Sequence, residues 1–202
     1  MDYIEEDNAQ NELDLKTSLV QEMQLNAFQS ERTIYIWESI NDNTAFITNR
    51  MIEKLCIPDI NGIKQPITIK ISSTGGEVFS ALSIVSAIER AQEKGYEVIT
   101  MAYACCMSAA VNLLSAGTKR YGQRYTRFMI HDVGSYNFGF QSKEDIKNNY
   151  EEHEAIWKLL SELLMKKSKL TKEKLDDIVK HKKEFYFWPE EALELGLIDE
   201  II

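Results

Sequence analysis

The sequence has few of the residues from which disulfide frameworks and metal sites are built. It contains three cysteines and three histidines among 202 residues. Cys56, Cys105 and Cys106 form an odd set without the spacing of a metal site, and the adjacent pair is poorly placed for an ordinary disulfide. We therefore expect reduced thiols and a cytoplasmic location.

Long apolar runs and an excess of basic charge are also missing. The apolar stretches are far shorter than the roughly 20 residues needed to cross a bilayer. The first seven residues are acidic, where a secretory signal would be basic. With 23 Lys and Arg against 32 Asp and Glu, the formal net charge is −9, which would repel a phosphate backbone. The composition thus predicts neither a membrane span nor a nucleic-acid partner.

What remains suits one α/β domain, since 44% of the residues are hydrophobic and 27% are charged. Residues 1–30 are acidic and are predicted to form a flexible N-terminal segment. Beyond it, strand, turn and helix recur three times before residue 131, which indicates βαβ crossovers and a mostly parallel, buried sheet. The patterns predict strands at 33–37, 66–71, 97–103 and 128–130, and helices at 43–55, from 78 to an end at Lys94-Gly95, at 108–116, 142–167, from 171 and at 189–196.

Three features could carry chemistry. Gly75 and Gly76 follow a predicted strand and let the backbone approach a ligand, although alone they indicate only a strand-to-helix turn. Ser108 is a lone polar residue among small ones at the start of a predicted helix, and alone it indicates a helix cap. His131 closes an apolar strand, as site residues of parallel sheets often do.

In their order and spacing these features resemble the Clp protease proteolytic subunit family. The resemblance covers about residues 31–202, and its motifs are the runs 72–78, 107–117, 129–131 and 189–199. It implies a crotonase-like fold of stacked βαβ units, with a long protruding handle helix within about residues 139–175. The region 31–202 would then be one serine peptidase domain.

The resemblance also implies acyl transfer by a Ser-His-acid triad. Ser108 matches the nucleophile and His131 the general base, while the backbone N–H groups of Gly76 and Ala109 match the oxyanion hole. The family's aspartate position falls on Glu184. Asp176 and Asp177 remain alternatives for the acid.

Assembly and substrates follow from the same resemblance. It implies a homo-oligomer of two stacked heptameric rings that cleaves unfolded proteins and small peptides, with no metal or other cofactor. An ATP-driven unfoldase is the implied partner. Thr68 and Lys70, however, stand where the family commonly has tyrosines of its ATPase-docking clefts, which leaves the identity of that partner open.

Three other functions remain open for the same residues. Glu184 and Asp132 could have made this a non-catalytic ring subunit. Phage capsid-maturation proteases share the fold, so the chain could be one of them. An acyl-CoA enzyme of the crotonase-like fold is the third alternative, although it would not need Ser108 and His131 together.

Overall fold

The computed structural model describes residue 28 and residues 30–134, 142–181 and 184–202. Its centre is a sheet in which β1 (Thr33–Ile36), β2 (Ile67–Ser73), β3 (Val98–Met107), β4 (Lys119–Gly122) and β7 (Glu200–Ile201) lie side by side in that order and run parallel. β5 (Arg127–Ile130) pairs with the distal end of β3, also in parallel. The predicted mostly parallel α/β architecture is confirmed.

Alternation along the central strands explains how the sheet is held. Ile67, Ile69 and Ile71 of β2 are fully buried, while the residues between them are half-buried. Because successive side chains of a strand point to opposite faces, the isoleucines form one continuous apolar face. Burial of such side chains stabilises the fold by about 1.5–3 kcal/mol each.

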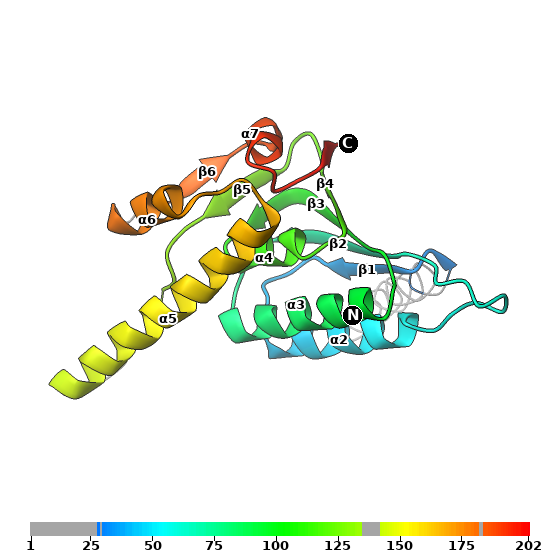
Figure 1. Ribbon diagram of the computed structural model, residues 1–202, viewed down its shortest axis with the longest axis horizontal. Helices are drawn as coiled ribbons and strands as arrows, with labels where there is room; N and C mark the ends of the chain where they lie inside the picture. The colour runs from blue at the N-terminus through cyan, green and yellow to red at the C-terminus, as the bar shows by residue number, and fades with distance from the viewer. Residues whose placement is uncertain (1–27, 29, 135–141, 182–183) are drawn as a thin grey trace, which may run out of the picture.

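Two helices cover one side of the sheet, where Figure 1 shows them lying side by side. α2 (Asp42–Leu55) begins at Asn41, whose side chain accepts a hydrogen bond from the Thr44 N–H at 3.0 Å. α3 (Val78–Glu93) follows the glycine pair, and its buried face carries Ile84 and Ile88. α4 (Ala109–Ser115) is buried along its whole length, because it packs between α3, the sheet and the next helix.

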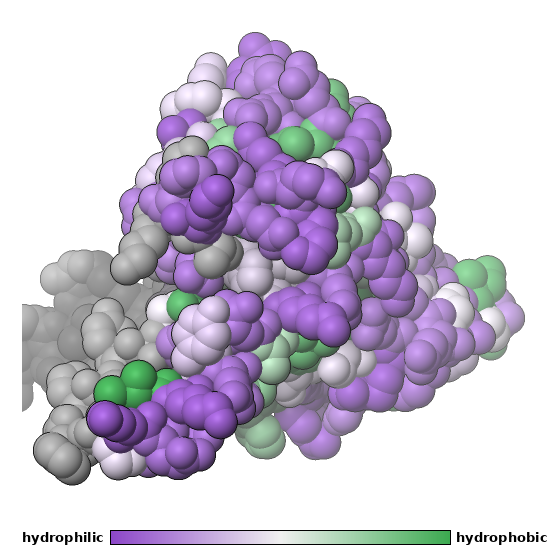
Figure 2. Space-filling view, turned by 60° about the vertical axis from the view of Figure 1, so that its left-hand side comes forward, coloured by the Kyte–Doolittle hydropathy of each residue, from purple (hydrophilic) through white to green (hydrophobic). Residues whose placement is uncertain are grey.

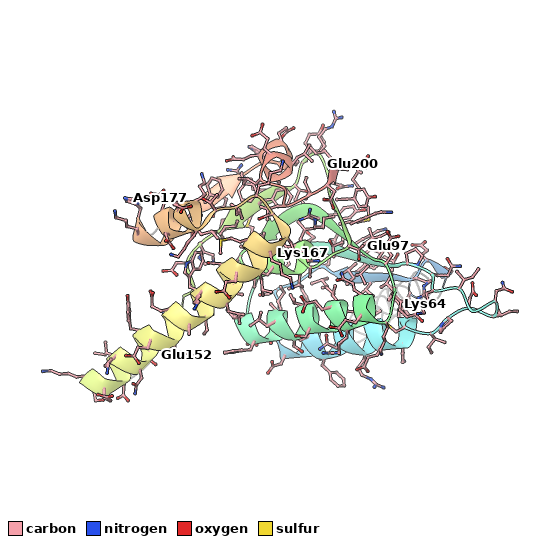
Figure 3. The ribbon with its side chains drawn as sticks, in the orientation of Figure 1. Lys64, Glu97, Glu152, Lys167, Asp177 and Glu200 are labelled. Atoms are coloured by element: carbon pink, nitrogen blue, oxygen red, sulfur yellow. The ribbon has the colours of Figure 1, made fainter. Side chains whose placement is uncertain are left out.

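The long helix α5 (Lys143–Lys167) is only partly covered. Ser142 and Asp145 form a capping box at its start, with the Asp145 N–H donating to the Ser142 hydroxyl. Its buried residues, Leu160, Ser161 and Leu164, all lie in its C-terminal half. The other half projects from the body, as the yellow ribbon of Figure 1 shows, and Figure 3 places Glu152 on this projecting part and Lys167 against the body.

The C-terminal part returns to the sheet through α6 (Lys172–Lys180), β6 (Phe185–Phe187) and α7 (Pro189–Glu194). β6 runs antiparallel to β5, and the rings of Phe128 and Phe187 stack with their centroids 5.4 Å apart. Because Ile130 pairs with Phe185, this arrangement places Glu184, the residue before Phe185, near the end of β5.

Several boundaries differ from the sequence-based expectations. β4, β6 and β7, each two to four residues long, were not predicted. The strand predicted to end at 103 continues to Met107, whereas the long helix predicted at 142–167 spans Lys143–Lys167. Apart from residues 28 and 30, the segment 1–30 predicted to be flexible lies outside the described residues.

The surface has the mainly hydrophilic character that the composition predicts for a globular chain. The face in Figure 2 is mostly hydrophilic, with small hydrophobic patches between polar side chains. Within the described ranges, no helix combines the length and the apolar character that crossing a membrane requires.

Candidate active site

Ser108 sits where β3 passes into α4, and its backbone is in an uncommon conformation. Its φ is 53° and its ψ is −128°, a region that residues other than glycine rarely adopt. Neighbouring backbone groups hold it there: the Ser108 N–H donates to the Met129 carbonyl at 2.8 Å, and the Val111 N–H donates to the Ser108 carbonyl at 3.0 Å. The strained turn projects the Ser108 side chain out of the regular strand and helix.

His131 lies directly against this serine. The parallel pairing of β3 with β5 sets Met107 opposite Met129, so the residues just beyond the two strands, Ser108 and His131, are neighbours. The His131 Nε2 is 2.8 Å from the Ser108 Oγ. Ser108 occupies the N-cap position of α4 but makes no side-chain capping hydrogen bond, so its hydroxyl is oriented by His131 and not by the helix.

The glycine pair lies beside the serine and has to be glycine. Gly76 has a φ of 151°, and a Cβ there would lie 2.0 Å from the Ile40 carbonyl oxygen. A Cβ on Gly75 would lie 2.7 Å from the Ser108 Cβ. The loop backbone therefore reaches the site closely because side chains are absent.

Two backbone N–H groups next to Ser108 are free in the part of the chain that the structure describes. The bridge between Ile40 and Gly76 uses the Ile40 N–H, the Glu77 N–H and the carbonyls of Ile40 and Gly75. The N–H groups of Gly76 and Ala109 donate to none of the described residues. Free N–H groups are what a developing oxyanion requires.

Glu184 lies opposite His131 across the two antiparallel strands. β5 and β6 pair Ile130 with Phe185, and the next step of this register sets His131 opposite Glu184. The Glu184 side chain is exposed, and its Oε2 accepts a hydrogen bond from the Tyr186 hydroxyl at 3.1 Å. Glu184 therefore directly precedes β6, near the end of β5 that His131 follows, but its hydrogen bond is to Tyr186.

The two alternative acids are engaged elsewhere on α6. The Asp176 carboxylate is 2.5 Å from the Lys172 Nζ, and the Asp177 carboxylate is 2.9 Å from the His181 Nδ1. Both pairs are exposed, and the structure brings neither aspartate to His131. Figure 3 shows Asp177 on α6 at the periphery of the molecule.

A cavity of about 430 Å³ opens at Ser108 and His131, and Gly76 and Ala109 also line it. Its other walls come from α3, α4, the segment after β5, and the covered half of α5; among them are Val78, Asn112, Asp132, Trp157, Leu160 and Leu164. This volume accommodates an amino-acid side chain next to the hydroxyl. Sequence reasoning missed Asn112, although its position four residues after Ser108 could have indicated it, because side chains at i and i+4 share a helix face.

The Cys106 thiol, which lies on β3 before Ser108, is poorly suited to act as a nucleophile. Burial raises the pKa of the Cys106 thiol far above its ordinary value, and the neighbouring Cys105 raises it further. Cys106 is fully buried in β3, so it stays protonated and enclosed in the core. Ser108 thus has a hydroxyl that lies at the cavity and contacts the His131 ring.

Comparison with known proteins identifies relatives along most of the chain. The family model for Clp protease matches residues 17–202. The ATP-dependent Clp protease proteolytic subunit 3 of Parasynechococcus marenigrum (strain WH8102) is 29% identical over 175 residues, which are 85% of this chain and 82% of the relative. Subunit 1 of Prochlorococcus marinus subsp. pastoris (strain CCMP1986 / NIES-2087 / MED4) is 30% identical over 175 residues, covering 85% and 84% of the two chains.

Proposed function

The chain belongs to the Clp protease family, and on this premise we propose that it is a serine endopeptidase subunit that cleaves unfolded polypeptides and small peptides. The observation that carries the proposal is the 2.8 Å contact between the Ser108 Oγ and the His131 Nε2 at the mouth of a cavity. A serine hydroxyl is a weak nucleophile until a base takes its proton, and His131 is in position to do so.

The reaction follows from this geometry. The Ser108 Oγ attacks the scissile carbonyl carbon while the His131 Nε2 takes the hydroxyl proton, which gives a tetrahedral oxyanion. The N–H groups of Gly76 and Ala109 donate hydrogen bonds to that oxygen. Collapse breaks the C–N bond as His131 returns the proton to the leaving amine. Water then attacks the acyl-enzyme by the same route and releases the acid and free Ser108.

Glu184 is our proposed acid of the triad. Its place opposite His131 in the β5–β6 register supports this role. A carboxylate there would accept a hydrogen bond from the His131 Nδ1–H and hold the tautomer in which Nε2 is free to take a proton. In the described conformation the Glu184 side chain is bonded to Tyr186, so the role requires a change of its rotamer.

The assembly proposal rests on the family and on α5. We propose a homo-oligomer of two stacked heptameric rings in the cytoplasm, with the projecting half of α5 as the handle between rings. Ile146 and Tyr150 on this half are exposed in the single chain. An ATP-driven unfoldase would deliver substrates. Lys70 lies 5.2 Å from the centroid of the Tyr35 ring, so with Thr68 it makes the expected docking region more polar than a cleft lined by tyrosines.

A fluorophosphonate probe tests the proposed nucleophile. We expect the probe to label Ser108 covalently in the wild type, and peptide mapping would locate the label. Ser108→Ala should abolish labelling, and Ser108→Ala and His131→Ala should each reduce peptide cleavage by a factor of about 10³ or more. Ser72→Ala, which alters a half-buried serine on β2, is the matched control and should be labelled and active.

The opposite results have definite meanings. Full peptidase activity of Ser108→Ala would disprove the proposed nucleophile. A folded oligomer that takes no label and cleaves no peptide would favour the non-catalytic ring subunit instead.

A further inference from the structure

Asn112, a buried residue with a side-chain amide, lines the catalytic cavity and also a smaller pocket beside it. Asn112 is only 7% exposed, and it lies one helical turn after Ser108 on α4. Its Oδ1 is buried and has no hydrogen-bond partner in the described part of the chain. Buried polar side chains nearly always have partners, so this amide needs one from outside the fold.

The surroundings of the amide are otherwise apolar. Val78, Trp157, Leu160 and Leu164 line the same cavity. The charged side chain among the described lining residues is Asp132, and its Oδ1 accepts a hydrogen bond from the Val133 N–H at 2.8 Å. Beyond Ser108 and His131, a ligand that enters the cavity therefore meets a largely apolar wall that includes the Asn112 side chain.

We propose that Asn112 selects substrates whose P1 residue, the residue whose carbonyl Ser108 attacks, carries a primary carboxamide, with glutamine as the preferred side chain. This inference rests on the proposed peptidase function. Because i and i+4 side chains share a helix face, Asn112 lies on the side of α4 that Ser108 begins. A P1 side chain, which branches from the α-carbon next to the attacked carbonyl, would enter the cavity that both the apolar residues and Asn112 line.

Carboxamides fit this position better than charged or aliphatic groups. A half-turn of the Asn112 side chain exchanges its donor and acceptor, and a primary amide has both a donor and an acceptor to match either orientation. A carboxylate or ammonium group would lose its hydration against an apolar wall without an opposite charge bonded to it. An aliphatic P1 side chain would fill the space but leave the amide without a partner.

Peptides that differ only at P1 test the inference. Glutamine and methionine are compared because they have similar length and shape, and glutamate provides a charged analogue. We expect wild-type kcat/KM to be about tenfold higher for glutamine than for methionine, because a site built to hydrogen-bond a substrate discriminates against the analogue lacking that group. Asn112→Leu, and Asn112→Ala in case leucine fills the cavity, should bring this ratio to one or below while methionine peptides are still cleaved.

Ser115→Ala is the matched control, because Ser115 is buried on the same helix and its hydroxyl also lacks a partner in the described chain. Ser115 does not line the main cavity, so the ratio should be unchanged. An equal ratio in the wild type and both Asn112 variants would overturn the inference and leave the peptidase proposal intact. Failure of the wild type to cleave any of the three peptides or to react with a fluorophosphonate would overturn the peptidase proposal itself, and the inference with it.

Discussion

At the scale of single residues, the proposed role of Glu184 depends on the negative charge of its side chain. Its glutamine variant keeps the size of the side chain but removes the negative charge that would orient and stabilise a protonated His131. We expect Glu184→Gln to lower kcat at least tenfold with little change in KM, since loss of a triad carboxylate acts mainly on the transition state. Steady-state kinetics on a fluorogenic peptide would measure both constants.

Asp176→Asn is the control for that experiment. It removes an acidic group of similar exposure from α6, where Asp176 pairs with Lys172. Its kcat should match the wild type. An unchanged rate in Glu184→Gln together with a reduced rate in Asp176→Asn would reassign the acid.

Gly76 provides a second prediction at this scale. A Cβ at this position would lie 2.0 Å from the Ile40 carbonyl oxygen, so the loop has to move in Gly76→Ala. We expect the variant to lose about 2–4 kcal/mol in the free energy of unfolding, and to lose peptidase activity because its N–H is displaced. Denaturant unfolding would measure the first effect and peptide cleavage the second.

Gly62→Ala separates the close approach from the backbone conformation. Gly62 also has a positive φ, 77°, but a Cβ there would meet nothing within 4 Å. Its alanine variant should lose only about 1 kcal/mol and keep its activity. Equal destabilisation of the two variants would contradict the importance of the Ile40 contact.

At the scale of elements, Arg120 joins the ends of several of them. From β4, its Nη2 is 2.5 Å from an Asp199 carboxylate oxygen, and its Nη1 donates to the carbonyls of Gly196 at 2.7 Å and of Lys167 at the end of α5. Burial acts to raise the pKa of Asp199, but hydrogen bonds and the charge of Arg120 outweigh it, so the pKa is lowered. The carboxylate thus stabilises the attachment of α5 and β7 to the sheet.

The sign of the pH dependence follows from that direction. The folded pKa lies below the unfolded value of about 3.9, so the contribution is complete above that value and is lost as pH falls through the folded pKa. Because Asp199 is nearly half exposed, we expect Asp199→Asn to lose only about 1–2 kcal/mol near neutral pH. The difference from the wild type should shrink below about pH 4, as denaturant unfolding at several pH values would show. A difference that stays constant down to the lowest pH would contradict this.

The elements also show what the sequence could and could not predict. The strands and helices around Ile67–Ile71 and Val78–Ala91 follow from strict periodicity, and they were predicted within a few residues. β6 was not predicted, because its place depends on pairing with β5, which is more than 50 residues away in the sequence. Ser108 and His131 are likewise brought together by the pairing of β3 with β5. From the sequence they were predicted as a pair only through the order of the family motifs. The sequence did not distinguish Asn112 from an ordinary helix residue, because the lack of a partner for its Oδ1 depends on the folded surroundings.

At the scale of the whole molecule, α5 leaves apolar side chains exposed that the single chain does not cover. Half of this 25-residue helix projects from the body, and Ile146 and Tyr150 are 56% and 64% exposed on it. Figure 1 shows this half extending away from the sheet and the helices beside it. A helix that cannot bury its apolar side chains against its own domain gains most of its stability from a partner.

This suggests a test of the assembly. We expect the wild type to sediment as a large oligomer and the double variant Ile146→Glu, Tyr150→Glu to sediment as single rings or smaller species. Removal of two apolar contacts per chain would forfeit about 1.5–3 kcal/mol for each fully buried side chain, and the new carboxylates would repel one another where copies meet. Circular dichroism should show an unchanged fold, because both side chains are exposed in the single chain.

Glu152→Gln is the control for the double variant, because it changes a charge on the same projecting half without altering its apolar side chains. Sedimentation velocity should give it the wild-type mass. If the double variant keeps the wild-type mass, the rings are joined by another surface. If the wild type itself is a monomer, the projecting helix has another partner and the compartment proposed for proteolysis does not form from this chain alone. A closed chamber is what would restrict this open site to unfolded substrates. Such a monomer should therefore also cleave folded proteins at exposed loops. A comparison of the cleavage of casein with the cleavage of a folded protein would detect this.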